Sequence, residues 1–170
     1  MPQAAFERIR ARRIRHEWEW LKRAAAANPG RLVAPEEPGG IVQLPETPYY
    51  RMDGTEGRGI AVRFEFPEYY PSVPLEAWLL FPVLHPNVHP ENGFVCLWDM
   101  RQEGTSLVEA VRQLQRVVSW RLYNPSADHL MQPQAGVRPA LPYEPVAPPP
   151  GYELERSAGL PPGKFRKRLS

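Results

Sequence analysis

The only cysteine of this chain, Cys96, lies in a short segment rich in histidine, asparagine and proline, "LHPNVHPENGFVCLW" at residues 84–98. A cysteine reacts as its thiolate, so a functional thiol must be reachable from solvent and gains from polar groups nearby. His85 and Asn87 supply side chains that can hydrogen-bond the backbone or polarise a carbonyl, and the prolines restrict the movement of the segment. These neighbours favour covalent chemistry at the sulfur of Cys96.

Two less reactive interpretations of Cys96 stay open. The cysteine stands between Val95 and Leu97, and such a triplet is typical of a small buried hydrophobe. A metal site is the other interpretation, and its possible ligands are His85, His89, Cys96 and Asp99. Each histidine precedes a proline, and no second cysteine or pair of carboxylates completes a ligand shell. We therefore expect no metal in this segment.

A hydrolytic use of the thiol would need a base close to Cys96. His129, which follows Asp128 directly, is the candidate for that base. No helix N-terminus is predicted at Cys96 to lower the pKa of the thiol, so the sequence gives a cysteine protease little support.

A helix is expected to precede the segment, at Pro2–Ala27. Apolar residues at spacings of three and four form one stripe there, comprising Ala11, Ile14, Trp18, Leu21 and Ala25. Asn28-Pro29-Gly30 ends the helix. Between Leu32 and Leu80 the apolar residues alternate with others and are separated by Gly-rich and Pro-rich breaks, which predicts three or four antiparallel strands in a meander.

A long irregular loop is predicted at 82–104, because this stretch has no clear period and contains Pro, Asn and Gly throughout. Ser106 and Glu109 then form a capping box for a second helix, which Asn124-Pro125 ends. Its buried stripe comprises Leu107, Val111, Leu114 and Val118. Helix, meander, loop and helix predict an α+β domain with the helices packed on one face of a sheet.

Composition indicates the number of domains and the cellular compartment. A chain of 170 residues with 42% apolar residues can bury one core, and about half of its 22 prolines follow Asn124, which predicts an extended or partly disordered arm after Met131. The sequence contains no apolar run long enough to span a bilayer and no signal peptide core. A single cysteine cannot form an internal disulfide, so we expect a reducing, cytoplasmic setting.

Three stretches, taken in order, resemble the ubiquitin-conjugating enzymes, which hold ubiquitin or a ubiquitin-like protein as a cysteine thioester. "FPEYYPSVP" at residues 66–74 is similar to the element between the third and fourth strands of that family. "HPNV" followed by "NGFVCL" is similar to its His-Pro-Asn signature and catalytic cysteine. "YNPSADHL" at residues 123–130 is similar to its Asn-Pro-x-Asp loop. The resemblance spans about residues 5 to 132.

The resemblance implies roles for four residues. Cys96 would be the nucleophile that accepts the acyl group. Asn87 would stabilise the oxyanion of the tetrahedral intermediate, and His85 would pin the loop. Asp128 would orient the incoming lysine and ease the loss of its proton. The segment between His85 and Cys96 is one residue longer than the commonest family pattern, which would displace Asn87 from the thioester carbonyl.

The resemblance also implies a domain organisation and partners. Residues 1–132 would form a UBC-like catalytic domain, and residues 133–170 a Pro-rich basic extension in place of the two C-terminal helices of eukaryotic members. Arg8, Arg12 and Arg15 on the first helix would dock the activating enzyme, and the other partners would be a ubiquitin-like protein and a lysine-bearing target. Truncated members are typical of bacterial conjugation operons that include a JAB-type deconjugase and serve in phage defence. No cofactor is implied.

Two other classes of function remain. An inert relative would bind a ubiquitin-like protein or another partner without chemistry, although such variants usually lose the cysteine that this chain retains. Nucleic-acid binding would use the Arg-rich start, but the paired Trp18 and Trp20 indicate a helix that packs on the sheet and offers no stacking platform. Nucleic acid and membrane are therefore not expected partners.

Overall fold

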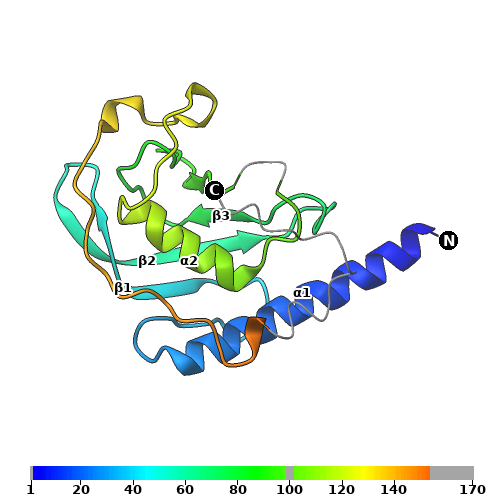
Figure 1. Cartoon of the computed structure of the whole chain (residues 1–170). Coiled ribbons are helices and arrows are strands. Elements are labelled where there is room, and N and C mark those ends of the chain that lie inside the picture. The colour runs from blue at the N-terminus through cyan, green and yellow to red at the C-terminus, as the bar shows by residue number, and fades with distance from the viewer. Residues whose placement is uncertain (1, 99–101, 154–170) are drawn as a thin grey trace.

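The computed structural model describes residues 2–98 and 102–153, and it shows an α+β fold (Figure 1). The elements in chain order are α1 (Pro2–Ala27), β1 (Val42–Tyr50), β2 (Glu56–Glu65), β3 (Glu76–Leu79), β4 (Phe94–Val95), α2 (Leu107–Val118) and two 3₁₀ helices, Ala127–His129 and Pro133–Ala135. No helix within these described ranges is both long and apolar enough to cross a membrane.

The four strands form one antiparallel meander in the order β1-β2-β3-β4, as predicted. The fourth strand has only two residues and lies inside the stretch predicted as an irregular loop. Gly93, just before β4, has a φ of 76°, and a Cβ there would collide with the carbonyl oxygen of Leu79 on the neighbouring strand. A glycine therefore lets the chain approach β3 closely enough to pair and lead into Cys96.

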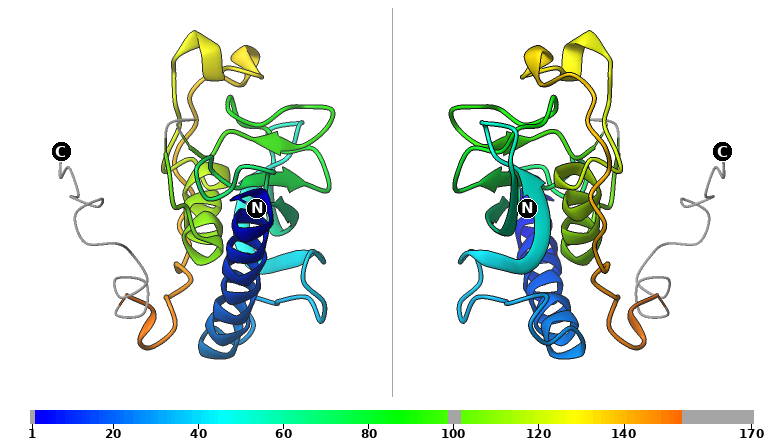
Figure 2. Two further views of the ribbon diagram at one scale, coloured as in Figure 1. Left: turned by 90° about the vertical axis from the view of Figure 1, so that its right-hand side faces the viewer. Right: turned by 90° about the vertical axis from the view of Figure 1, so that its left-hand side faces the viewer.

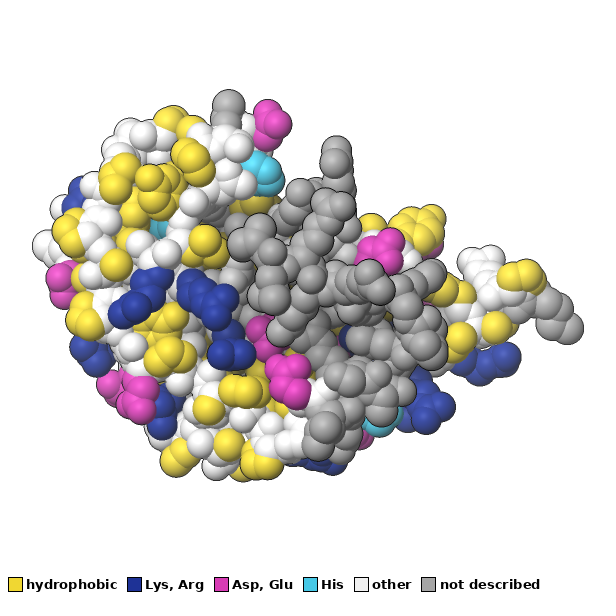
Figure 3. Space-filling model, in the orientation of Figure 1, with side chains coloured by type: hydrophobic (Ala, Val, Ile, Leu, Met, Phe, Trp, Pro, Cys, Tyr) yellow, Lys and Arg dark blue, Asp and Glu magenta, His cyan; other side chains and the backbone are white. Residues whose placement is uncertain are grey.

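The helix α1 has the predicted bounds, and most of its predicted stripe faces the core. Trp18 and Leu21 are buried, Ile14 and Ala25 are partly buried against the core, and Ala11 is exposed. The N-terminal part of α1 projects beyond the body of the molecule (Figures 1 and 3). The fully buried residues of α1 begin at Glu17.

The helix α2 begins as predicted and ends six residues earlier than Asn124. The Ser106 hydroxyl accepts a hydrogen bond of 3.3 Å from the backbone N–H of Glu109, which is one half of the predicted capping box. At the other end, Trp120 has a φ of 63°, a left-handed conformation that ends the helix. Trp120 is buried, and its indole N–H donates to the carbonyl of Leu84 at 3.0 Å, which holds this turn in place.

A buried carboxylate joins the two helices. Glu17 of α1 accepts hydrogen bonds from Arg13 at 2.9 Å and from the backbone N–H of Leu107, the first residue of α2, also at 2.9 Å. The hydroxyl of the buried Tyr70 lies 3.3 Å from the same carboxylate. Glu17 thus satisfies a free N–H at the start of α2, where a negative charge is favoured by the helix dipole.

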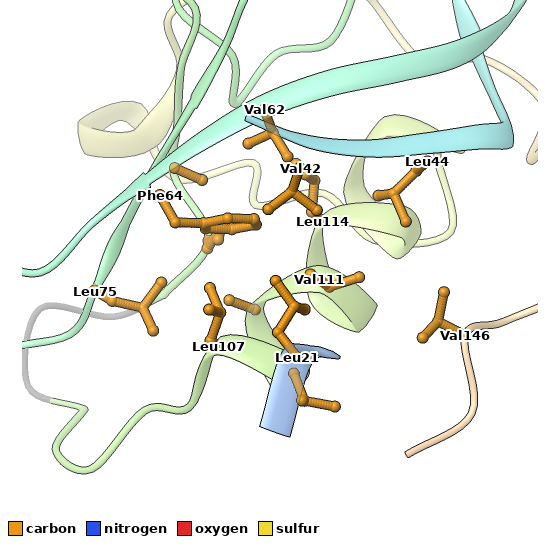
Figure 4. Packing of buried hydrophobic residues seen from close by; sticks show 14 of the residues in the cluster. Leu21, Val42, Leu44, Val62, Phe64, Leu75, Leu107, Val111, Leu114 and Val146 are labelled. Atoms are coloured by element: carbon orange, nitrogen blue, oxygen red, sulfur yellow. The ribbon is translucent and has the colours of Figure 1, made fainter. Parts of the chain in front are cut away.

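One hydrophobic core lies between the sheet and the two helices. Val42, Val62 and Phe64 of the sheet point toward Leu107, Val111 and Leu114 of α2, and Leu21 of α1 lies against them (Figure 4). Val146, far along the chain, belongs to the same cluster.

The first part of the Pro-rich extension is extended, and it packs on the domain along the side of α2 that faces away from the sheet (Figure 2). The backbone N–H of Val146 donates to the side chain of Gln115 at 2.9 Å, and Ala147 exchanges two hydrogen bonds of 2.8 Å with Asn28. Tyr152 is buried against Trp20 and bonds the hydroxyl of Ser106. Residues up to 153 therefore complete the core, while the basic end at 154–170 lies outside the described residues.

Candidate functional site

The thiol of Cys96 lies at the edge of a cleft. Cys96 follows β4 directly, and its backbone N–H donates to the carbonyl of Asn87 at 2.9 Å. Cys96 is half-buried and lines the cleft, whereas Val95 and Leu97 on either side are buried. The cleft has a volume of about 320 Å³, and its other lining residues are Asn87, Leu97, Trp98, Gln113, Val117, Leu122, Tyr123, Asn124 and Pro125.

The described lining of the cleft is apolar or uncharged. Of the described residues that line it, none has a charged side chain, and the polar ones are mainly amides. The amide of Gln113 donates to the carbonyl of Leu97 at 3.3 Å, which ties the wall from α2 to the chain after Cys96. Trp98 packs against the core, and its indole nitrogen is buried with no hydrogen-bond partner in the described part of the chain.

Asn87 is buried under the cleft and joins two segments of the chain. Its side-chain N–H₂ group donates to the carbonyls of Asn124 and His129, both at 2.9 Å, and its oxygen accepts from the backbone N–H of Asn124 at 2.7 Å. Both amide hydrogens are thus directed at the 124–129 loop. For Asn87 to stabilise an oxyanion, one of these two hydrogen bonds would have to be exchanged for one to the substrate.

His85 lies deeper and is completely buried. Its Nδ1 accepts from the backbone N–H of Asn87 at 3.1 Å, so its Nε2 has the proton and donates to the carbonyl of Leu122 at 3.1 Å. Burial lowers the pKa of His85 to about 4, and the bond to the Leu122 carbonyl opposes that shift only in part. His85 is therefore neutral at pH 7 and links the 85–88 and 122–132 segments.

Gln132 also joins the 83–88 and 122–132 segments, and the sequence analysis missed this role. We call His85, Asn87 and Gln132 the clamps of the site. Its side-chain N–H₂ group donates to the carbonyls of Val83 and Val88 at 2.8 and 2.9 Å, and the backbone N–H of Met131 donates to the carbonyl of Pro86 at 2.7 Å. Gln132 is fully buried. A glutamine in a Pro-rich stretch gives no sequence signal for this role, because its partners are more than 40 positions away.

The clamps hold the 3₁₀ helix Ala127–His129 beside the thiol. Asp128 is exposed on this helix. His129 is half-buried, and its Nδ1 lies 2.8 Å from the Sγ of Cys96, so the imidazole and the sulfur are in direct contact. Sequence analysis considered His129 only as the base of a protease, yet it is the side chain that the structure places on the sulfur.

The other residues that the sequence singled out are the docking arginines and two possible metal ligands. Arg8, Arg12 and Arg15 are exposed on the projecting part of α1, where Figure 3 shows Lys and Arg side chains, and they do not line the cleft. His89 accepts backbone hydrogen bonds within its own turn, and Asp99 lies outside the described residues. Among the residues that the structure describes, no three His, Cys, Asp or Glu side chains are grouped to hold a metal ion.

The arrangement combines a half-buried thiol, an imidazole in contact with it, an exposed carboxylate on the same loop and a cleft whose described lining residues are uncharged. Such a set can form a covalent acyl intermediate on sulfur and manage the protons of its formation and breakdown. Comparison with known proteins adds no family to this description, since no family model matches the chain and no curated protein matches it.

Proposed function

We propose that this protein is a conjugating enzyme that takes the C-terminal acyl group of a ubiquitin-like protein onto Cys96 as a thioester and transfers it to a target amine. The main support is the half-buried thiol of Cys96 on a cleft of about 320 Å³ whose described lining residues are all uncharged. The cleft would take an extended peptide tail, with the acyl carbonyl at its end against the sulfur. The three motifs that resemble the ubiquitin-conjugating enzymes, and the order of helix, meander and helix, agree with this function.

The proposed reaction has two acyl transfers. In the first, Cys96 attacks the thioester on a cysteine of the activating enzyme, so that one C–S bond forms and another breaks. In the second, an amine attacks the Cys96 thioester, an amide forms and the sulfur of Cys96 leaves. Asp128 is exposed on the loop beside the thiol, where its carboxylate would attract and orient a lysine ammonium.

Partner recognition would use surfaces outside the cleft. Arg8, Arg12 and Arg15 project into solvent on α1, and we propose that they dock an acidic surface of the activating enzyme. We also propose that the protein acts in a bacterial conjugation operon with a JAB-type deconjugase, in the cytoplasm and in defence against phage.

The decisive experiment is charging of Cys96. The protein is incubated with ATP and with the activating enzyme and ubiquitin-like protein encoded beside its gene, then analysed on non-reducing gels and by mass spectrometry. We expect a thiol-labile adduct on Cys96, a thiol-stable oxyester on Cys96→Ser and no adduct on Cys96→Ala. An adduct that forms equally on Cys96→Ala would disprove the assignment. No adduct on the wild type, with both partners active in control reactions, would favour an inert binding module.

A thiol hydrolase is the second candidate, and the contact of 2.8 Å between His129 Nδ1 and Cys96 Sγ favours it. A hydrolase would cleave a ubiquitin-like protein fused through its C-terminal carbonyl to a reporter peptide, without ATP. Multiple turnovers that stop in Cys96→Ala would support it. A conjugating enzyme should leave the fusion intact and pass its thioester to lysine much faster than to water.

A further inference from the structure

His129 is held against Cys96 by its own backbone as well as by its side chain. Its carbonyl accepts a hydrogen bond of 2.9 Å from Asn87, and its N–H donates to the carbonyl of Ser126 at 2.9 Å. Asn87 also accepts the backbone N–H of Cys96 through its own carbonyl at 2.9 Å. A single buried residue thus fixes the backbones of both Cys96 and His129, and the imidazole and the thiol meet at 2.8 Å.

We propose that His129 is a catalytic residue that accepts the proton of Cys96 and thereby supplies the thiolate. This inference rests on the proposed function and adds an acid–base group to it. In charging, the Sγ proton moves to Nδ1 of His129 and the thiolate attacks the incoming thioester. The new C–S bond forms, the old one breaks, and the departing thiolate takes the proton from the imidazolium. The imidazole returns to its neutral form.

The same imidazole serves the discharge step. A Cys96 thioester has no S–H, so Nδ1 of His129 is free to accept a proton from the attacking amine. When the tetrahedral intermediate collapses, the amide forms, the C–S bond breaks and the proton passes from His129 to the leaving sulfur of Cys96. Asp128, adjacent to His129, would bring the amine to the loop, while His129 would remove the proton.

Three other titratable groups lie near the pair among the residues that the structure describes. They are Asp128 next to His129, Tyr123 in the cleft wall and His85 under Asn87. His85 has both ring nitrogens engaged with backbone groups, as described above.

The first test is the alkylation of the thiol by iodoacetamide at several pH values. Because Cys96 is the only cysteine, the mass increase reports on this sulfur alone. At pH 6 we expect His129→Gln to react about tenfold more slowly than wild type. The wild type would hold a larger fraction of its cysteine as thiolate, and this gain outweighs the lower intrinsic nucleophilicity of a thiolate that forms at lower pH. The matched control is His16→Gln on α1, an exposed histidine that should react like wild type. Equal rates for His129→Gln and wild type would overturn the proposal.

A second measurement needs no variant of His129. The far-ultraviolet absorbance of the thiolate is followed with pH in the wild type, and the same titration of Cys96→Ser is subtracted. A thiolate that forms well below the range of free cysteine, which is about 8.5, supports the pair. A transition at the free-cysteine value contradicts it, even if His129→Gln folds poorly.

These two tests do not use the ubiquitin-like protein, so their result is independent of charging. A low-pH thiolate without any thioester would keep the role of His129 as proton acceptor and reject the conjugating function. Thioester formation with a thiol that titrates and alkylates like free cysteine would support the conjugating function and reject the role of His129 as proton acceptor. If both hold, single-turnover discharge onto lysine should be slower in His129→Gln at saturating lysine, with wild-type discharge in His16→Gln.

Discussion

Two pairs of similar residues lie around Cys96 and differ in what their polar atoms contact. We call His85 and Asn87 the floor of the site, and Asp128 and His129 its rim; of the four, Asn87 lines the cleft. On the floor, His85 and Asn87 are buried, and their side-chain hydrogen bonds all go to backbone groups. On the rim, Asp128 is exposed and His129 presents a ring nitrogen to the sulfur of Cys96. Two pairs of similar residue types in one site thus have different roles: His85 and Asn87 hold the backbone, while Asp128 and His129 face solvent and the thiol.

This difference predicts how variants should separate. A floor variant leaves backbone donors or acceptors unpaired in a buried place, so it should lower the free energy of unfolding. A rim variant removes a group that faces solvent or the thiol, so it should lower the rate of a reaction step and leave stability nearly unchanged. Variants of the floor should therefore lose the most stability, and variants of the rim the least.

Asn87→Ala should have the largest effect. It removes three hydrogen bonds that join the 124–129 loop to the floor, and we expect the free energy of unfolding to fall by about 3 kcal/mol. The same loss frees His129, so alkylation of Cys96 at pH 6 should slow as well. Urea unfolding followed by tryptophan fluorescence measures the first effect.

Asn92→Ala is the matched control for that variant. Asn92 lies in the same loop but is exposed, and its side chain accepts one hydrogen bond of 2.9 Å from Phe94. Its loss should cost less than about 1 kcal/mol and leave alkylation unchanged. If Asn92→Ala and Asn87→Ala destabilise equally, the buried bonds of Asn87 do not hold the rim, and the contrast between floor and rim fails.

His85 predicts a pH dependence of stability. Its pKa is about 4 in the folded protein and about 6.5 when unfolded, so the unfolded chain binds the proton more tightly. The stability it contributes is complete above pH 6.5 and is lost as the pH falls toward 4, by about 2 kcal/mol between pH 7 and pH 5. Urea midpoints at several pH values measure this loss.

The variant His85→Gln isolates the contribution of His85 to the pH dependence of stability from the contribution of the carboxylates. It is expected to be less stable than wild type at pH 7 and to lose less stability between pH 7 and pH 5. The same slope in both proteins would show that His85 is not buried in its neutral form, and the structural description of the floor would be wrong.

Local signals were sufficient for much of the fold. The bounds of α1 and the start of α2 follow from periodicity and from the Ser106 cap, which act within one turn of helix. The predicted end of α2 at Asn124-Pro125 is wrong, because the chain turns left-handed at Trp120, whose indole N–H donates to the carbonyl of Leu84. Neither Trp120 nor its neighbours indicate such a turn, and the contact is formed across 36 positions.

Long-range partners explain the other differences. In the sequence, Glu17 is typical of a solvated helix residue. In the structure its buried carboxylate contacts Arg13, Tyr70 and the backbone N–H of Leu107, which the sequence does not indicate. Val146 lies in a Pro-rich stretch with too few apolar residues to predict packing, and its backbone is bound by the side chain of Gln115. In the site, the sequence indicated Cys96 and its loop but could not place His129 on the sulfur.

Asp128→Asn should have the smallest effect on stability and still slow one step of the proposed reaction. Asp128 is exposed, so the free energy of unfolding should change by no more than about 0.5 kcal/mol. Charging of Cys96 should proceed as in wild type, because no amine takes part in it, whereas discharge onto free lysine should slow about tenfold or more. Discharge onto hydroxylamine, which is neutral at pH 7, serves as the control and should slow much less. Equal slowing with both nucleophiles would mean that Asp128 orients the loop and not the lysine, and the rim would then resemble the floor.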